Sequence, residues 1–269
     1  MNLEIPNEWN PRDYQMPLWM ALQGGTKRAV AVWHRRAGKD SLSLNFTASK
    51  ALCDRVGVYW HMAPTQKQVR KIVWDNIGAD GKRIIDQVWP EAVRKSTRND
   101  EMKIELVNGS IWQCVGSDNY DSLVGANPVG VVFSEYSLAN PAAWDYIRPI
   151  LAENGGFALF IYTPRGQNHG EELFRMAETN DDWFCEILTA DDTKAISKEV
   201  IQEERKAGMS EENIQQEFFC SFEGTVSGSF YGKMLKEIED KDQITSVPVE
   251  SELEVHTAWD LGIGDSTAI

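Results

Sequence analysis

The sequence predicts an α/β fold: a mostly parallel β-sheet with helices on both faces, plus a small helical subdomain. Apolar runs that suit buried strands alternate with segments of helical pattern, which is the order of a sheet covered on two sides. Polar loops follow the apolar runs after residues 33, 62, 133 and 162. Sheets of this kind bind ligands at the carboxyl ends of their strands, so all four loops are expected at such ends.

Local patterns predict the individual elements. Strands are expected where apolar residues run continuously or alternate, at 28–33, 56–62, 102–107, 110–115, 129–133 and 157–162. Asn108-Gly109 is a hairpin turn signal between two of them. Helices are expected at 16–22, 42–52, 66–77, 141–151 and 169–178, and residues 191–219 predict charged helices with a break at Gly208.

The length of 269 residues fits one large domain or two modest ones. We expect an α/β core, a helical lid, a connector and the start of a further domain, at 1–190, 191–222, 223–254 and 255–269. The sequence stops on Ala268-Ile269, which looks like the middle of an element. It is therefore expected to end just inside a second domain.

The net charge of −14 is unevenly distributed. Residues 1–110 hold 17 Lys and Arg against 12 Asp and Glu, whereas residues 111–269 hold 10 against 29. The basic clusters Lys67–Lys71 and Arg94–Lys103 could contact nucleic-acid phosphates or could be ordinary solvated helix faces. The acidic half predicts a solubilising or partner-facing surface.

The sequence does not support a membrane protein, a zinc-binding domain or a disulfide-stabilised domain. No stretch reaches the ~18 apolar residues of a membrane span, and the N-terminus lacks a signal-peptide pattern. The four cysteines are far apart without a C-x-x-C pair, which argues against a zinc site and a disulfide framework. We expect reduced cysteines in a cytosol.

Residues 33–41, Trp-His-Arg-Arg-Ala-Gly-Lys-Asp-Ser, join a predicted strand to a predicted helix. This is the setting of a phosphate-binding loop, where the helix start offers unpaired N–H groups to an anion. Lys39 would reach the outer phosphates of a nucleotide, and Gly38 would let the backbone approach them. Trp33 replaces the first glycine of G-x-x-x-x-G-K-[ST], and Asp40 replaces the residue that holds Mg²⁺. The alternative is a helix capped by Asp40 beside two solvated arginines.

An acidic residue, Glu135, follows the apolar run 129–133. It would polarise the water that attacks a γ-phosphate. The usual pair at this place is Asp-Glu, with the Asp helping to hold Mg²⁺, but here Ser134 replaces the Asp. We expect Asp40 to take over part of the metal role, so that the two departures compensate. A solvated residue at a strand end is the alternative for Glu135.

Further polar residues lie near these strand ends. Arg35 or Arg36 could act as an arginine finger in cis, or could form a salt bridge or a DNA contact. Thr163 could sense the γ-phosphate, although Thr163-Pro164 also suits a plain strand end. The amide of Gln15 could bond both the donor and the acceptor edge of adenine.

The segment 255–269 resembles the first strand of a ribonuclease-H-like nuclease. Asp260 would there be one of several carboxylates that hold two divalent ions. The other carboxylates do not follow in this sequence, so this chain is not expected to cut DNA. A plain turn at Asp260 is the alternative.

Taken in order, the loop, Ala63-Pro-Thr65, Glu135, Thr163-Pro164 and Asp260 resemble the large terminase subunit of tailed bacteriophages. The resemblance covers nearly the whole sequence. Its most specific elements are Arg35–Lys39, the block from Leu123 to Glu135, and Glu217–Phe222.

This resemblance implies a P-loop NTPase fold of the ASCE (RecA-like) type. It also implies an ATPase that uses ATP and Mg²⁺ to pull double-stranded DNA through a portal protein into a procapsid. The intact protein would also be a metal-dependent nuclease. Its implied partners are the portal, the small terminase subunit and further copies in a ring, in the host cytoplasm rather than in the mature virion.

The functional residues of the family fall on positions already singled out. The implied catalytic residues are Lys39, Arg35, Glu135 and Thr163. The expected nucleotide site is Gln15, Arg35, Arg36, Ala37, Gly38, Lys39, Asp40 and Ser41. The expected metal ligands are Asp40 and Ser134 for the ATPase and Asp260 for the nuclease. Many members carry a trans-acting arginine at the position of Val124, for which Arg148 and Arg165 are candidate replacements.

Two other functions stay open from the sequence. A helicase-like or DNA-repair ATPase shares the loop and Ala63-Pro-Thr65, and would displace a strand from a forked substrate. A non-hydrolysing module would use the degenerate loop to bind DNA or a capsid protein, and would show no Mg²⁺-dependent ATPase activity.

Overall fold

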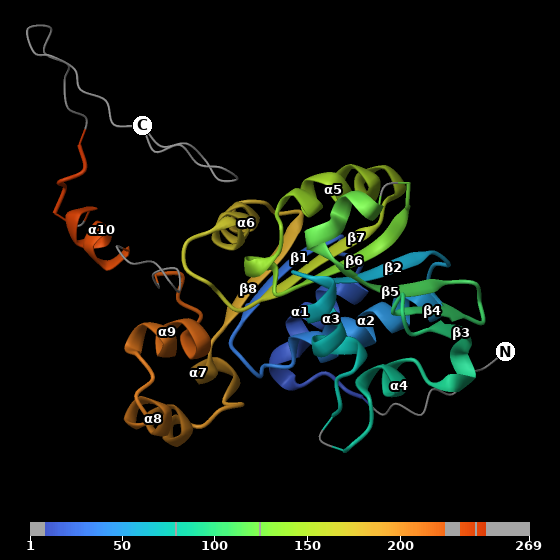
Figure 1. Ribbon diagram of the computed structural model, residues 1–269, viewed down its shortest axis with the longest axis horizontal. Helices are drawn as coiled ribbons and strands as arrows, with labels where there is room; N and C mark the ends of the chain where they lie inside the picture. The colour runs from blue at the N-terminus through green and yellow to red at the C-terminus, as the bar shows by residue number, and fades with distance from the viewer. Residues whose placement is uncertain (1–8, 79, 124, 224–231, 240, 246–269) are drawn as a thin grey trace, which may run out of the picture. The chain divides into compact units, whose positions relative to one another are not determined.

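The computed structural model describes residues 9–78, 80–123, 125–223, 232–239 and 241–245. The chain divides into two compact units, Met1–Gly228 and Ser229–Ile269. The first unit contains the sheet and the helices that pack on it (Figure 1). In the second unit the described residues include helix α10 (Gly232–Glu239), which lies within the stretch predicted as a connector.

The first unit is built on a mostly parallel sheet, which confirms the predicted fold class. Its described residues form eight strands in the order β3-β4-β5-β2-β6-β7-β1-β8. The strands from β5 to β8 in this order are parallel, and β3 and β4 pair antiparallel. Their bounds are β1 (Arg28–Trp33), β2 (Val58–Ala63), β3 (Arg94–Arg98), β4 (Lys103–Leu106), β5 (Ile111–Gly116), β6 (Pro128–Ser134), β7 (Phe157–Tyr162) and β8 (Trp183–Leu188).

Helices cover both faces of the sheet (Figure 1). One core joins the sheet to α1, α2 and α4 through side chains such as Leu18, Phe46 and Ile85, and the other joins it to α5 and α6 through Trp144 and Leu173. The helices are α1 (Met16–Gln23), α2 (Lys39–Cys53), α3 (Gln66–Val69), α4 (Ile84–Val88), α5 (Ala142–Asn154), α6 (His169–Glu178), α7 (Ala190–Thr193), α8 (Lys198–Lys206) and α9 (Glu211–Phe219). Shorter turns are η1 (Asp13–Gln15), η2 (Arg70–Trp74), η3 (Glu91–Val93), η4 (Ser117–Leu123) and η5 (Tyr136–Leu138).

The apolar runs become the central strands. Every residue of β6 and β7 is buried, as expected for strands between two helical layers. The patterns do not predict β3 and β8, which lie at the two edges of the sheet. β3 is a polar strand with no buried residue, and β8 is half-buried along its length.

The helix predicted at 66–77 is wrong in its second half. α3 passes into the π-helical turn η2, which ends at Trp74. Trp74 is buried and stacks on Trp112 with ring centroids 6.1 Å apart, so packing of this side chain overrides the regular helix. The basic cluster Arg94–Lys103 lies on the β3–β4 hairpin, so its interpretation as a helix face is also wrong.

A separate cluster stabilises the three helices after β8. Ala190, Ile201, Ile214 and Phe218 from α7, α8 and α9 pack together. Hydroxyl groups of the preceding Thr189, Ser197 and Ser210 cap the three helices. The predicted break at Gly208 lies between α8 and α9, where this glycine has a φ of 98°.

The strand order positions the polar residues at the carboxyl ends. β7 lies between β1, which leads into the loop His34–Gly38, and β6, which leads into Glu135. Thr163 directly follows β7, so it lies between the loop and the acid. None of the helices among the described residues combines the length and the apolar character needed to cross a bilayer.

Candidate active site

The loop His34–Gly38 connects β1 to α2 in a tight turn. Gly38 and Arg36 both have left-handed backbone conformations, with φ of 79° and 69°. The positive φ of Gly38 favours glycine, and a Cβ there would lie 2.9 Å from Gln15 Nε2 and would displace that amide. The first turn of α2 then presents main-chain N–H groups that have no acceptor within the helix.

Lys39 is buried at the base of this loop. Its ammonium group makes three hydrogen bonds: Nζ donates to Trp33 O at 3.0 Å, to His34 O at 3.2 Å and to Thr163 Oγ1 at 2.9 Å. Burial lowers the pKa of Lys39, and the negative charges of Glu135 and Asp40 oppose that shift. The ammonium group is therefore held beside two carboxylates at the point where β1 ends.

Asp40 and Ser134 form a pair across the site. Ser134 Oγ donates to Asp40 Oδ1 at 2.7 Å. Burial by itself raises the pKa of Asp40, but His61, Ser134 and Lys39 together hold that pKa below its usual value. In the usual P-loop site the hydroxyl belongs to the loop and the carboxylate to the strand. Here the two residue types are exchanged between these positions, and a hydroxyl–carboxylate hydrogen bond still joins them.

Asp40 and Ser134 can supply only part of the ligands of a cation, so the rest must come from a nucleotide and water. The Asp40 side chain is 30% exposed, so solvent and ligands reach it. Among the described residues, no group of three or more His, Cys, Asp or Glu side chains is arranged to hold a metal ion. Mg²⁺ commonly takes one or two protein ligands and completes its shell with substrate phosphates and water. The donor set therefore fits Mg²⁺ only together with a nucleotide.

Glu135 follows β6 in a left-handed conformation, with a φ of 53°. Its carboxylate makes no hydrogen bond or ion pair with the described residues. Burial raises the pKa of Glu135, as does the charge of Asp40, while Lys39, Arg165 and Arg35 lower it. An unpaired carboxylate close to cationic side chains can accept a proton from a water molecule.

Thr163 connects the loop to the acidic turn. Its hydroxyl accepts from Lys39 Nζ and donates to Trp33 O at 3.0 Å. Its carbonyl oxygen accepts from Ser137 Oγ at 2.9 Å, in the turn η5 that follows Glu135. One residue thus contacts the lysine, the end of β1 and the segment after the acid.

Arg35 is bound to helix α9. Its Nε donates to Glu217 Oε2 at 2.6 Å, and its main-chain N–H donates to Glu217 O at 2.9 Å. Arg165 also forms an ion pair with Glu217. Burial alone would raise the pKa of Glu217, but the two arginines lower it. Of the roles expected for Arg35, this structure shows the salt bridge.

Gln15 braces the loop. It is 2% exposed, and its Nε2 donates to Ala37 O at 2.9 Å and to Gly38 O at 3.3 Å. Tyr14 Oη also donates to Ala37 O, at 3.2 Å. The amide is thus occupied by the loop, and its role toward adenine stays a prediction.

The structure brings most predicted site residues together. Lys39, Asp40, Ser134, Glu135 and Thr163 meet at the carboxyl ends of β1, β6 and β7. The Arg36 side chain is exposed, as is that of Arg148, which lies near Arg28 at the amino end of β1. Asp260 and Val124 lie outside the described residues.

Two neighbours of the site were not among the predicted functional residues. Glu217 belongs to the segment singled out for its resemblance, but only folding shows that it binds Arg35. His61, on β2, lies with Nε2 3.4 Å from Asp40 Oδ1. It is a single histidine inside the predicted strand 56–62, and no pattern in the sequence marks it as a neighbour of Asp40.

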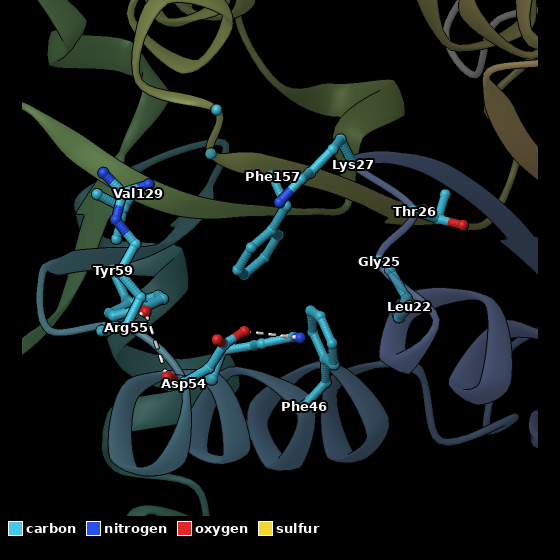
Figure 2. Close-up of a pocket in the computed structure, with 13 residues that line it drawn as sticks. Leu22, Gly25, Thr26, Lys27, Phe46, Asp54, Arg55, Tyr59, Val129 and Phe157 are labelled. Carbon is cyan, nitrogen blue, oxygen red and sulfur yellow. Dashed lines mark hydrogen bonds and ion pairs between the residues drawn. The ribbon is translucent and has the colours of Figure 1, made fainter.

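Figure 2 shows a pocket at the amino ends of the central strands, opposite to the end where the candidate active site lies. It is lined at the amino ends of the strands by residues that include Lys27, Arg55, Tyr59, Val129 and Phe157. Its cavity of about 50 Å³ has room for a few water molecules, not for a nucleotide. The candidate active site is therefore not this cavity.

Comparison with known proteins places the sequence in context. The large terminase subunit of Escherichia phage T5 is 26% identical over 96% of this chain and 59% of its own length. The sequence is thus similar to a phage large terminase subunit over nearly its whole length. It spans 59% of the length of that terminase relative. No family model matches the sequence.

Solved terminase structures share the fold. The ATPase domain of the Thermus phage P74-26 large terminase superposes with a TM-score of 0.63 at 20% identity, covering 80% of this chain and 100% of that domain. The large terminase of a second thermophilic bacteriophage, in complex with ADP, gives 0.62 at 16% identity over 80% of this chain and 54% of that one. The HK97 large terminase gives 0.57 at 14% identity over 79% and 50%. The described fold is therefore that of terminase ATPase domains.

Proposed function

We propose that this chain binds and hydrolyses ATP as the motor part of a large terminase subunit, which translocates double-stranded DNA through a portal into a procapsid. The observation that carries the proposal is the position of Lys39. Its ammonium group lies where β1 meets α2, within hydrogen-bond distance of Thr163 and beside the Asp40–Ser134 pair. The relationship to the phage T5 terminase supports the same function.

In this proposal the loop cradles the triphosphate. The N–H groups at the start of α2 bind phosphate oxygens, and Lys39 leaves its three carbonyl and hydroxyl acceptors to reach the β- and γ-phosphates. Arg35 stabilises the charge that develops on the γ-phosphate, after exchanging Glu217 for the phosphate. Gln15 is the proposed adenine contact, with Arg36, Ala37, Gly38 and Ser41 completing the nucleotide site.

Asp40 and Ser134 would hold Mg²⁺ together with the phosphates. When bound, the ion neutralises negative charge on the phosphate oxygens. Glu135 orients and deprotonates the attacking water, since its carboxylate has no competing partner among the described residues. Thr163 relays loss of the γ-phosphate, because its hydroxyl and carbonyl connect Lys39 to the turn after Glu135.

The DNA, the portal, the small terminase subunit and a ring of copies are proposed partners. Asp260 and the nuclease activity of the intact protein also stay proposals, as do the four predicted divisions of the chain. The large terminase of that second thermophilic bacteriophage has been solved in complex with ADP and with ATP-γ-S, which supports a nucleotide ligand here.

The test is Mg²⁺-dependent ATPase activity of the chain, alone and with a portal ring and linear duplex DNA. Turnover that rises with portal and DNA, without strand displacement on a forked duplex, supports the packaging motor. Strand displacement would favour the helicase-like alternative. No nucleotide uptake by calorimetry, even with portal, DNA and Mg²⁺ present, would leave only the non-hydrolysing module.

A further inference from the structure

A buried histidine lies beneath the Asp40–Ser134 pair. The side chain of His61, on β2, is 0% exposed, and its Nε2 lies 3.4 Å from Asp40 Oδ1. Neither ring nitrogen has a hydrogen-bond partner among the described residues. A buried polar group without a partner destabilises the folded state, so its presence at this position needs an explanation.

We propose that His61 is a positioning residue that orients the Asp40 carboxylate toward a nucleotide-bound divalent cation. The inference rests on the proposed function, since it assumes that Asp40 binds the cation of a metal–nucleotide complex. His61 is fully buried, so it does not reach the nucleotide itself. Its effect must pass through Asp40.

The two oxygens of Asp40 have different surroundings. Oδ1 accepts the Ser134 hydroxyl at 2.7 Å and faces His61 Nε2, so both protein neighbours lie on one oxygen. Oδ2 makes no hydrogen bond with the described residues. The Ser134 hydrogen bond restrains Oδ1, and in the proposal His61 adds a second restraint on the same oxygen, which leaves Oδ2 for the cation.

The contact of 3.4 Å is longer than a good N–H···O hydrogen bond. A movement of about 0.5 Å by the Asp40 carboxylate would close it, and hydrogen bonds in active sites commonly tighten when the ligand binds. In the proposed arrangement Nε2 is the ring nitrogen that donates to Asp40 Oδ1. Partners that orient metal-binding carboxylates typically contribute about 10–100-fold to metal affinity or activity.

The test compares nucleotide affinity with and without the cation. A fluorescent ATP analogue is titrated into the full chain and into His61→Leu and His61→Gln variants, in Mg²⁺ and in EDTA. We expect His61→Leu to weaken the Mg²⁺-nucleotide complex about tenfold, with the affinity in EDTA changed less than about twofold. His61→Gln, which keeps an N–H donor, should recover most of the loss.

Cys114→Ala is the matched control for packing. Cys114 faces His61 in register on the adjacent strand β5 and is equally buried. This change should lower the melting temperature without altering the difference between Mg²⁺ and EDTA. If His61→Leu does not give a folded protein by circular dichroism, His61→Met replaces it as the variant without a donor.

A double-mutant cycle with Asp40→Asn tests the route of the effect. If His61 acts through Asp40, His61→Leu should cause little further loss in the Asp40→Asn background. Equal losses in Mg²⁺ and EDTA, no loss at all, or a His61→Gln variant as impaired as His61→Leu would each overturn the inference. Wild-type protein that fails to bind the analogue in any condition would instead refute the proposed function.

Discussion

The two ends of the parallel strands differ in the burial and pairing of their charged side chains. At the carboxyl ends, Lys39 and Glu135 are drawn together by the fold, and burial shifts the pKa of both. At the amino ends, around the pocket of Figure 2, Lys50 and Asp54 form an ordinary ion pair at 2.9 Å on the last turn of α2. The comparison teaches that, in this molecule, buried charge and the cavity lie at opposite ends of the strands, and the proposed active site lies with the buried charge.

The largest expected effect is on turnover. Replacing Glu135 with Gln should lower the ATPase rate constant about 10²–10⁴-fold, because the neutral amide cannot accept a proton from water. Nucleotide affinity should change little, since in the proposed site Glu135 acts on the attacking water and not on the phosphates. Steady-state ATPase assays paired with nucleotide titration would separate the two. Unchanged turnover would remove Glu135 from the mechanism and weaken the contrast between the strand ends.

The next effect is on binding. Lys39→Ala should lower ATP affinity about 100-fold, since it removes a charge-assisted contact to the phosphates. Lys50→Ala is a matched control on the same helix, at its other end. It should leave affinity unchanged. The measurement is titration with a fluorescent nucleotide, and similar losses in both variants would show that the two ends of α2 do not differ as described.

A smaller effect concerns the contact between the loop and α9. Glu217→Ala leaves Arg35 and Arg165 without their carboxylate and should lower the free energy of unfolding by about 1–3 kcal/mol. The pKa of Glu217 is lowered in the folded state, so the contribution exists at neutral pH and is lost as pH falls through that pKa. Urea unfolding at several pH values measures it.

Glu211→Ala provides the comparison on the same helix. Glu211 pairs with Arg205 on the surface at 2.8 Å, and its removal should not change stability measurably. Equal losses for Glu211 and Glu217 would contradict a special role for the buried carboxylate.

The smallest effect concerns Glu186, a half-buried carboxylate on β8 outside the candidate active site. Trp33 Nε1 donates to Glu186 Oε1 at 3.0 Å, and burial raises the pKa of Glu186 to about 7. Because folding raises this pKa, stability should fall as pH increases from about 4.5 to about 7. Glu186→Gln should flatten that dependence and stabilise the protein by about 1–2 kcal/mol at pH 8, after allowance for partial exposure. Thermal unfolding across this range checks it, and an unchanged slope would contradict it.

Much of the fold follows from local patterns. Continuous apolar runs predict β1, β6 and β7 because these strands are buried on both faces. The edge strands β3 and β8 carry no such signal, since neither contains a fully buried residue. The π-helical turn before Asp75 depends on where Trp74 packs, which is a tertiary effect that no short window of sequence contains.

The site divides in the same way. Gly38-Lys39 and the acid after β6 are recognisable because spacing along the chain fixes them. Glu217, 182 residues beyond Arg35, becomes its partner only when α9 folds against the loop. His61 is a single histidine in an apolar strand, and nothing nearby in the sequence indicates that Asp40 will lie beside it.

The hydrogen bond from the backbone of residue 35 to the carbonyl of residue 217 has a consequence of its own. It does not depend on the identity of either side chain. Exchanging both charged groups for neutral ones would therefore leave helix α9 hydrogen-bonded to the loop His34–Gly38. Only proline at position 35, which lacks the N–H, would remove this hydrogen bond by a single replacement.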